Sequence, residues 1–418
     1  MNLTWANLRS SAAPWIVLPA VFYISLYLGD ITYSVPSHYG VESGETAAFA
    51  MAVIAPAAAA ATAWEAGRYR LIGPVRSTST RSPLVRFLRA AAPALLLYLV
   101  LAVAALVLAR HATGVWPGGA GWFAVAHLVV LPLGWAVIGW FVGGAVPRSV
   151  AAPVVAIGCW GWLAMPHAMS NPSLRHLGGF IDGGSSVTDI RDAAVYLVPW
   201  GVVAGLAAAA WLMTGANRRG LKSTLAAAVA AATLTAGCLA VTDWGYRVPT
   251  HPRVVAMSCT GQDPRVCVPP EYQPYAEQLR KEAGEPLNRL KAAGVPAPQE
   301  LRISSPETPP RAGTWPLQWS LPALDGPSGQ DQYKTDLAEA AVAGTAANAG
   351  VRDCRQPGSV AAAWATLVIG ADARSVQQAV SPADWSALQQ IRRLPAEEQA
   401  EWFERKAASQ EHCVEVAP

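Results

Sequence analysis

The stretch STLAAAVAAATLTAGCLAV, residues 223–241, ends the apolar part of this chain. It holds eight alanines and no charged residue, and the polar segment TDWGYRVPT, residues 242–250, follows it directly. Six earlier stretches are also apolar and lack Asp, Glu, Lys and Arg in their interiors. After residue 241 nothing is long enough to cross a bilayer, because a spanning helix needs about 20 apolar residues at a rise of 1.5 Å each. The sequence therefore predicts a polytopic all-α membrane domain, residues 1–241, and a soluble domain, residues 242–418.

We expect about seven transmembrane helices. The first six each contain one internal proline, which a spanning helix tolerates when neighbouring helices satisfy the freed backbone groups. The seventh contains none, so the pattern favours a six-helix bundle followed by a tether. The GxxxG pairs Gly139/Gly143 and Gly201/Gly205 predict close helix packing, within the chain or in a dimer. The expected helices cover residues 12–32, 46–64, 89–109, 121–144, 149–166, 193–214 and 223–241.

Charge in the loops predicts the orientation of these helices. Residues 1–241 hold 14 Lys/Arg against 7 Asp/Glu, whereas residues 242–418 hold 17 against 21. Eleven of the 14 cations fall in one alternating set of loops, and only Arg110, Arg175 and Arg191 fall in the other. Short loops rich in Lys/Arg stay in the cytoplasm, so we expect a cytoplasmic N-terminus and an extracytoplasmic C-terminal domain in the cell membrane. The mildly acidic soluble half argues against nucleic-acid binding.

Four cysteines of the soluble half support that orientation. Cys259, Cys267, Cys354 and Cys413 form an even set, which suits two disulfides in an oxidising compartment. Three pairings are open, and we favour Cys259–Cys267 and Cys354–Cys413. A zinc site is the alternative, but the spacing lacks the C-x2-C pairs of structural zinc.

Few residues of the membrane half point to ion transport. His127 is the one ionisable residue that we expect inside a membrane helix, and a neutral, hydrogen-bonded histidine is the simpler interpretation of it. The absence of carboxylates at mid-membrane depth argues against an ion-coupled antiporter.

The soluble half shows no pattern typical of catalysis. We expect one or two strands within residues 255–268, a helix over 271–293 broken near Gly284 and Pro286, and helices at 333–349, 358–369 and after Pro395. A Pro/Gly-rich connector, residues 296–327, would separate them, with Trp315 and Trp319 as anchors. This predicts a small α-rich or α+β domain stabilised by disulfides. His-Glu-x-x-His and Gly-x-Ser-x-Gly motifs are both absent from the sequence, so we expect no enzyme, cofactor or metal.

The basic loop between the second and third helices, Glu65 to Arg89, mixes apolar residues with six arginines. A short basic amphipathic element of this kind lies along lipid headgroups or docks on a cytosolic partner.

Several short motifs resemble a known group. They are the entry from Trp5 to Trp15 (WANLRSSAAPW), Trp64-Glu65 before the basic loop, SLRHLGG at residues 173–179, VCVPPE at 266–271 and LPAEEQAEW at 394–402. Together with the six-helix count, they look similar to the membrane subunits of actinobacterial type-2 ABC exporters and to permease-like proteins with an uncharacterised extracellular domain. The resemblance implies a separate cytosolic ATPase, a homo- or heterodimer of permease subunits, and an ATPase-coupling loop containing Glu65, Arg68, Arg70, Arg76 and Arg81. The seventh helix departs from the family's six-helix pattern.

The leading hypothesis from the sequence is thus a permease-like membrane component of an ATP-driven ABC export complex. The exterior domain would serve recognition or assembly. The alternative is a membrane-anchored receptor or scaffold that transports nothing and displays an extracellular binding domain. A membrane-embedded enzyme is a weaker third hypothesis, because polar groups are scarce in the membrane segments.

Overall fold

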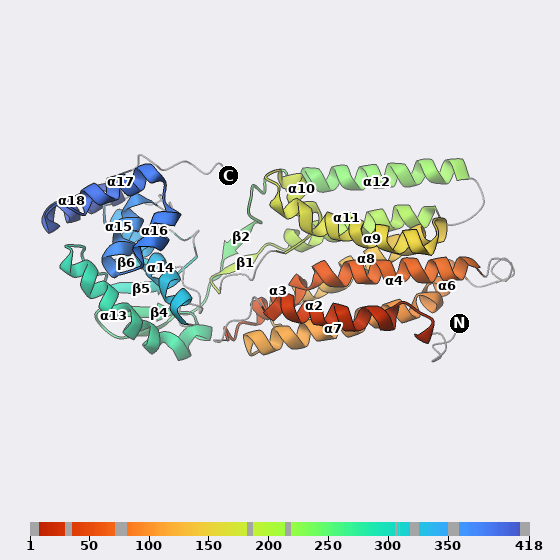
Figure 1. Ribbon diagram of the computed structural model, residues 1–418, viewed down its shortest axis with the longest axis horizontal. Coiled ribbons are helices and arrows are strands. Elements are labelled where there is room, and N and C mark those ends of the chain that lie inside the picture. The colour runs from red at the N-terminus through yellow and green to blue at the C-terminus, as the bar shows by residue number, and fades with distance from the viewer. Residues whose placement is uncertain are drawn as a thin grey trace. The chain divides into compact units, whose positions relative to one another are not determined.

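The computed structural model of the chain describes residues 8–29, 36–71, 82–181, 187–213, 219–305, 308, 310–317, 326–349 and 359–409. Contacts between Cα atoms divide the chain into two compact units (Figure 1). Unit 1 comprises Met1–Thr32, Tyr39–Ser185 and Arg191–Thr250. Unit 2 comprises His251–Pro418 together with the short segments Tyr33–His38 and Ser186–Ile190.

Apolar helices of unit 1 occupy the positions of all seven expected segments. Four of them, α7, α8, α11 and α12, are long and apolar enough to cross a membrane. Helices α3 and α4 meet the same criterion together but are bent by 45° at a short break, whereas α2 and α9 have only 17 residues each. The described chain thus has four to five helices able to cross a membrane, and the count of seven is not confirmed. The bounds are α2 Ala13–Gly29, α3 Gly40–Phe49, α4 Met51–Leu71, α7 Ala92–Thr113, α8 Gly121–Ala145, α9 Arg148–Ala164, α11 Ala194–Leu212 and α12 Arg219–Val241.

Small residues bring these helices together. Helix α4 packs along α8 and α9 and also contacts α7 and α2. A Cβ atom at Gly139 or Gly143 of α8 would lie 2.3 Å or 2.0 Å from a carbonyl oxygen of α4, so this GxxxG pair packs inside the chain. A Cβ atom at Gly205 of α11 would lie 2.3 Å from the hydroxyl of Thr233 in α12, whereas Gly201 faces open space. Helix α12, expected as a tether, therefore lies against α11 (Figure 1).

Shorter elements connect the apolar helices. They are α6 Pro83–Ala90, the 3-10 helix η1 Met165–Ala168, α10 Pro172–Leu177 and the strands β1 Asp189–Arg191 and β2 Thr250–Pro252. Strands β1 and β2 form a two-stranded sheet, and the boundary between the units runs through both of them.

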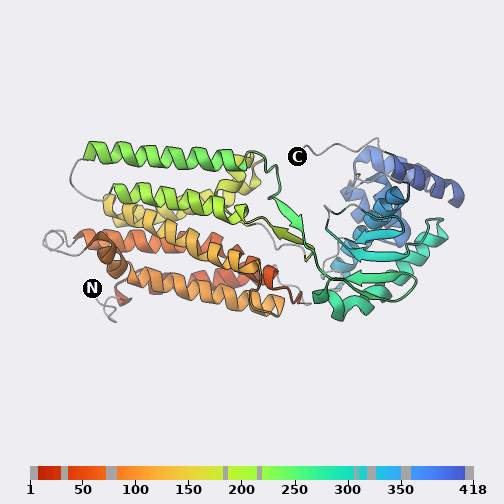
Figure 2. The same ribbon diagram turned by 180° about the vertical axis from the view of Figure 1, so that it is seen from behind.

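Unit 2 is built on a four-stranded mixed sheet in the order β3-β4-β5-β6 (Figure 2). The strands are β3 Ser258–Thr260, β4 Arg265–Val268, β5 Glu300–Ile303 and β6 Thr314–Leu317. Strands β3 and β4 are antiparallel, whereas β4, β5 and β6 run parallel. The helical elements are η2 Pro270–Tyr275, α13 Ala276–Ala292, α14 Gly326–Asn348, α15 Val360–Ile369, α16 Ala373–Ala379, α17 Pro382–Ile391 and α18 Ala396–Ala408.

Helix α13 and the connector differ from the expectation. Helix α13 continues through Gly284 and Pro286, because Leu279, Leu287 and Leu290 are buried along one of its faces and tertiary packing outweighs the local propensity. The expected connector contains β5 and β6, and Trp315 is a fully buried residue of β6. Trp319 lies outside the described residues. Unit 2 accordingly combines helices with a mixed four-stranded sheet, and two of the strands lie in the segment expected to be a connector.

Candidate functional site

The C-terminal end of α4 carries the first residues of the predicted coupling loop. Glu65 is only 3% exposed, and its Oε2 atom accepts a hydrogen bond from Nη1 of Arg68 at 2.7 Å. Nη2 of the same arginine donates to Oγ of Ser10 at 2.7 Å. Arg68 therefore links a buried carboxylate to the segment that precedes α2.

Two more arginines fix this end of α4 to its neighbours. Nη1 of Arg70 donates to the carbonyl oxygen of Ala145, the last residue of α8, at 3.2 Å. The guanidinium carbon of Arg148, the first residue of α9, lies 4.8 Å from the ring centre of Trp64, a distance typical of a cation–π contact. We call this end of unit 1 the arginine-rich end. Arg68, Arg70 and Arg148 each contact a neighbouring helix or segment, although Arg148 is exposed to solvent.

Helix α6 belongs to the same end and is strongly amphipathic. Pro83 occupies its first turn, and the Ser82 hydroxyl accepts a hydrogen bond from the backbone of Val85. Phe87 is buried, with its ring edge-on to the indoles of Trp140 and Trp211. The apolar positions 84, 87 and 88 share one face by helical spacing, and the basic positions 86 and 89 share the opposite face. Arg76 and Arg81, also expected in the coupling loop, lie outside the described residues.

A buried ion pair lies near the other end of the bent α3–α4 pair. Glu45 of α3 is 1% exposed, and its Oε1 atom accepts hydrogen bonds from Nε of Arg191 at 2.9 Å and from the Tyr196 hydroxyl at 3.1 Å. Sequence reasoning missed this cluster because Glu45 lies one residue before the expected second segment. Two sequence features could have indicated the pair. Glu45 is a carboxylate directly before an apolar stretch, and Arg191 is one of only three cations in the cation-poor set of loops.

His127 of α8 lies beside this cluster and is completely buried. Its Nδ1 atom accepts a hydrogen bond from the indole N–H of Trp200 at 2.7 Å, so Nε2 carries the proton and donates to the carbonyl oxygen of Gly179 at 2.6 Å. Both ring nitrogens are thereby used by a neutral imidazole. The ring also meets that of Tyr196 edge-on at 5.5 Å between centroids.

Helices α3 and α4 therefore join two buried carboxylates. Glu45 and Glu65 are twenty residues apart, about 30 Å along a helix before the bend is counted. Each carboxylate accepts a hydrogen bond from an arginine, so both are held in place. Among the described residues, no group of three or more His, Cys, Asp or Glu side chains could hold a metal ion.

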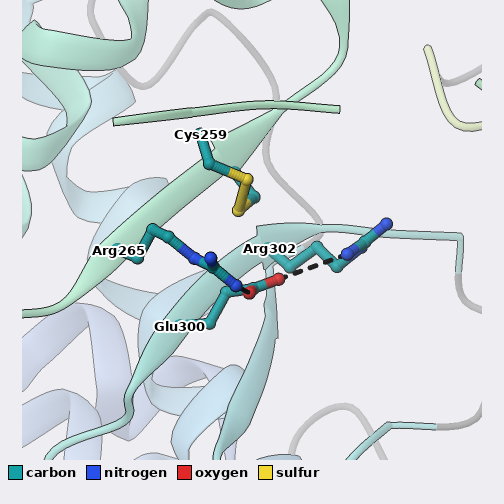
Figure 3. Close-up of a disulfide and its surroundings, with 5 residues drawn as sticks. Cys259, Arg265, Glu300 and Arg302 are labelled. Carbon is teal, nitrogen blue, oxygen red and sulfur yellow. Dashed lines mark hydrogen bonds and ion pairs between the residues drawn. A yellow bond between two sulfur atoms is a disulfide. The ribbon is translucent and has the colours of Figure 1, made fainter. Parts of the chain in front are cut away.

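The disulfide of unit 2 joins Cys259 of β3 to Cys267 of β4, the pair favoured from the sequence (Figure 3). The parallel register of β4 and β5 places Arg265 opposite Glu300, whose carboxylate accepts hydrogen bonds from Arg265 at 2.5 Å and from Arg302 at 3.2 Å (Figure 3). Because Arg265 is largely exposed and Arg302 is partly exposed, this network adds little stability. Cys354 and Cys413, the second predicted pair, lie outside the described residues.

Comparison with known proteins bears on unit 2 alone. A family model described as "Domain of unknown function (DUF7224)" matches residues 266–413, from β4 to a point beyond α18. No curated protein and no solved structure matches the chain. The C-terminal part of this protein is thus similar to a family whose description assigns no activity.

Proposed function

We propose that this protein is the permease-like membrane component of an ATP-driven export complex. The arginine-rich end would dock on a separate cytosolic ATPase subunit, and unit 2 would serve recognition or assembly on the other side of the membrane. A second permease subunit, identical or different, would complete the membrane part of the complex.

The observation that carries this proposal is the position of α4. This helix packs along α8 and α9 in the middle of unit 1, and its C-terminal end holds Arg68 and Arg70 in fixed contacts. Force applied by a partner at that end would therefore move a packed helix rather than a free loop. The α3–α4 break lies at the opposite end of α4. Glu45 of the Glu45–Arg191 ion pair belongs to α3, on the other side of that break, so a movement of α4 would act on this pair.

The proposed orientation places the arginine-rich end in the cytoplasm and unit 2 outside. The excess of Lys/Arg in one set of loops supports it, and so does the Cys259–Cys267 disulfide, which persists in oxidising compartments. All seven apolar helices would then cross the membrane. The two of 17 residues span about 26 Å, a mismatch that local thinning of the bilayer accommodates.

The test is purification of the tagged full-length chain from its own cells in a mild detergent, followed by measurement of ATP hydrolysis. The triple variant Arg70→Gln, Arg76→Gln and Arg81→Gln removes three charges without unpairing Glu65. We expect it to lower the co-purifying ATPase activity at least tenfold. The matched control, Arg374→Gln with Arg392→Gln and Arg393→Gln, changes three exposed arginines of unit 2 and should leave the activity unchanged.

Two outcomes would contradict the export proposal. One is a pure, folded protein with no accompanying ATPase. The other is an ATPase whose amount and activity do not respond to the arginine triple. Either result would favour the alternative of a membrane-anchored receptor or scaffold. Thiol labelling of intact cells tests the orientation separately: cysteines of unit 2 that label only after the membrane is permeabilised would reverse it.

A further inference from the structure

An apolar pocket opens among α6, α8, α11 and α12 in unit 1. Its volume is about 470 Å³, within the range of ligand-binding sites. Its wall is apolar throughout and comes from Leu84 and Phe87 of α6, Val137 of α8, Trp211, Leu212 and two alanines of α11, and Val229 of α12. Close packing brings helices together elsewhere in unit 1, so a pocket of this size forfeits dispersion contacts unless something fills it.

The depth of the pocket matches one leaflet of a bilayer. Leu84 and Phe87 belong to the amphipathic helix α6, and Leu212 is the last residue of α11, so the pocket begins at the arginine-rich end. Val137 lies eight residues before the end of α8 and Val229 ten residues after the start of α12, or about 12 Å and 15 Å inward along each helix. Half of a hydrocarbon core of about 30 Å is 15 Å, the depth reached by the acyl chains of one leaflet.

Basic residues belong to α6 and α12, two of the helices that line the pocket. On α6, Leu84 and Phe87 line the pocket, and Arg86 and Arg89 lie on the opposite face, which would meet the headgroup layer if α6 lies along a membrane surface. Lys222 lies in the first turn of α12, and Figure 1 shows α6 at the same end of unit 1 as this turn. The basic ends of membrane helices attract anionic lipid headgroups.

From these features we infer that the pocket binds one acyl chain of an anionic phospholipid whose phosphate group contacts Arg86, Arg89 and Lys222. Three features support an anionic lipid as the occupant: an apolar wall, a depth of one leaflet and basic residues on α6 and in the first turn of α12. A water-soluble ligand is disfavoured because the wall offers it almost no polar partner. This lipid site does not depend on the proposed export function.

Native mass spectrometry of the full chain in detergent tests this inference, with phosphatidylglycerol and phosphatidylcholine added in equal amounts. We expect the wild type to retain phosphatidylglycerol preferentially. The double variant Arg86→Gln and Arg89→Gln should lower that preference about fivefold for each charge removed. Arg9→Gln, a matched loss of an exposed arginine outside the pocket wall, should lower it much less.

A second variant tests the pocket itself. Ala208 contributes to the wall and is exposed, so the indole of Ala208→Trp should fill the pocket and abolish lipid retention without disturbing the buried helix contacts. Val107→Trp, on an exposed position of α7, is the matched control and should retain the lipid.

Equal retention of the two lipids by the wild type would overturn the anionic assignment. Unchanged retention by Ala208→Trp would overturn the pocket as the site. A lipid-free dimer that Ala208→Trp dissociates would show instead that a second copy of the chain covers this face. ATPase activity does not enter any of these readouts, so failure here is distinct from failure of the export proposal.

Discussion

The two units of this protein build their interiors from different side chains. Helix α4 of unit 1 is buried largely through alanines such as Ala55 and Ala59, and glycines of α8 contact it backbone to backbone. Unit 2 instead buries Trp315, Trp364 and Phe403 completely. In a bilayer, lipid tails are as apolar as the side chains, so helices associate through close approach and van der Waals packing. In water, removing large apolar surface from solvent supplies the driving force.

Two carboxylates, Glu45 of unit 1 and Asp336 of unit 2, differ in what surrounds them. Glu45 of unit 1 receives hydrogen bonds from a guanidinium and a phenol hydroxyl. Asp336 of unit 2 is half-buried and receives a hydrogen bond from the side-chain amide of Gln332 at 2.8 Å. Burial, together with the nearby charge of Glu339, raises the pKa of Asp336 to about 7, against a smaller opposing effect of the amide. The Glu45 carboxylate is thus held by two side-chain donors, whereas burial favours the protonated form of Asp336.

Loss of Arg191 should have the largest effect. Arg191→Met removes the cation from a buried ion pair, so we expect unit 1 to lose about 3–5 kcal/mol of stability, measured by thermal unfolding of the full chain in detergent. The double variant Arg191→Met and Glu45→Gln keeps an acceptor for Tyr196 and should recover most of the loss. A double variant as unstable as the single one would show that the arginine acts by packing alone.

Overpacking of the α4–α8 contact should come next. Gly143→Leu places a side chain where a Cβ atom would already lie 2.0 Å from the carbonyl oxygen of Ala63, so we expect a loss of about 3 kcal/mol. Gly144→Leu is the matched control, because a Cβ atom there meets nothing within 4 Å. Fluorescence-detected size exclusion of the two variants after heating measures the difference. Equal behaviour would mean that close approach does not stabilise unit 1.

Removal of the disulfide should weaken unit 2 alone. The pair Cys259→Ser and Cys267→Ser opens a loop with a sequence separation of 8, which corresponds to about 2.5 kcal/mol by loop entropy. Protease resistance of unit 2 within the full chain measures the loss, and reductant should lower the resistance of the wild type at least to the level of the double variant. A further loss when reductant is added to the double variant would report a second disulfide, such as Cys354–Cys413. Wild-type resistance in the variant would contradict the prediction.

The stability of unit 2 should also depend on pH. Because the folded pKa of Asp336, about 7, lies above the ordinary value of 3.8, the folded state holds this proton more tightly than the unfolded state. Its contribution to stability is therefore fully present below about pH 4 and is lost as the pH rises to about 7. Asp336→Asn should remove this slope and be more stable than the wild type at pH 8. Glu404→Gln, an exposed control, should keep the slope; a wild type without it would contradict the raised pKa.

The helices of unit 1 were more predictable than its candidate sites. Long apolar runs predict where the apolar helices lie, because a segment able to cross a bilayer must reach a minimum length. The sequence did not predict that Glu45 is buried and paired. Its partner, Arg191, lies 146 residues later in the chain, and Glu45 belongs to the short helix before the α3–α4 bend. The strands β5 and β6 were not predicted for a similar reason. Each is a short segment in a Pro/Gly-rich region, and its strand conformation depends on pairing with parallel neighbours rather than on its own residue pattern.

The sequence by itself located the change from apolar to polar residues at 241, the apolar helices and the arginine-rich loops, because hydropathy and charge are local properties. Short spacing favoured Cys259–Cys267 among three possible pairings, and the structure contains that pair. Only the tertiary structure decided that α12 packs against α11, that Glu45 meets Arg191, and that α6, α8, α11 and α12 line one apolar pocket. These features depend on which helices become neighbours. That choice comes from the fit of small residues such as Gly143 and Gly205 to distant backbones and side chains, which no local pattern records.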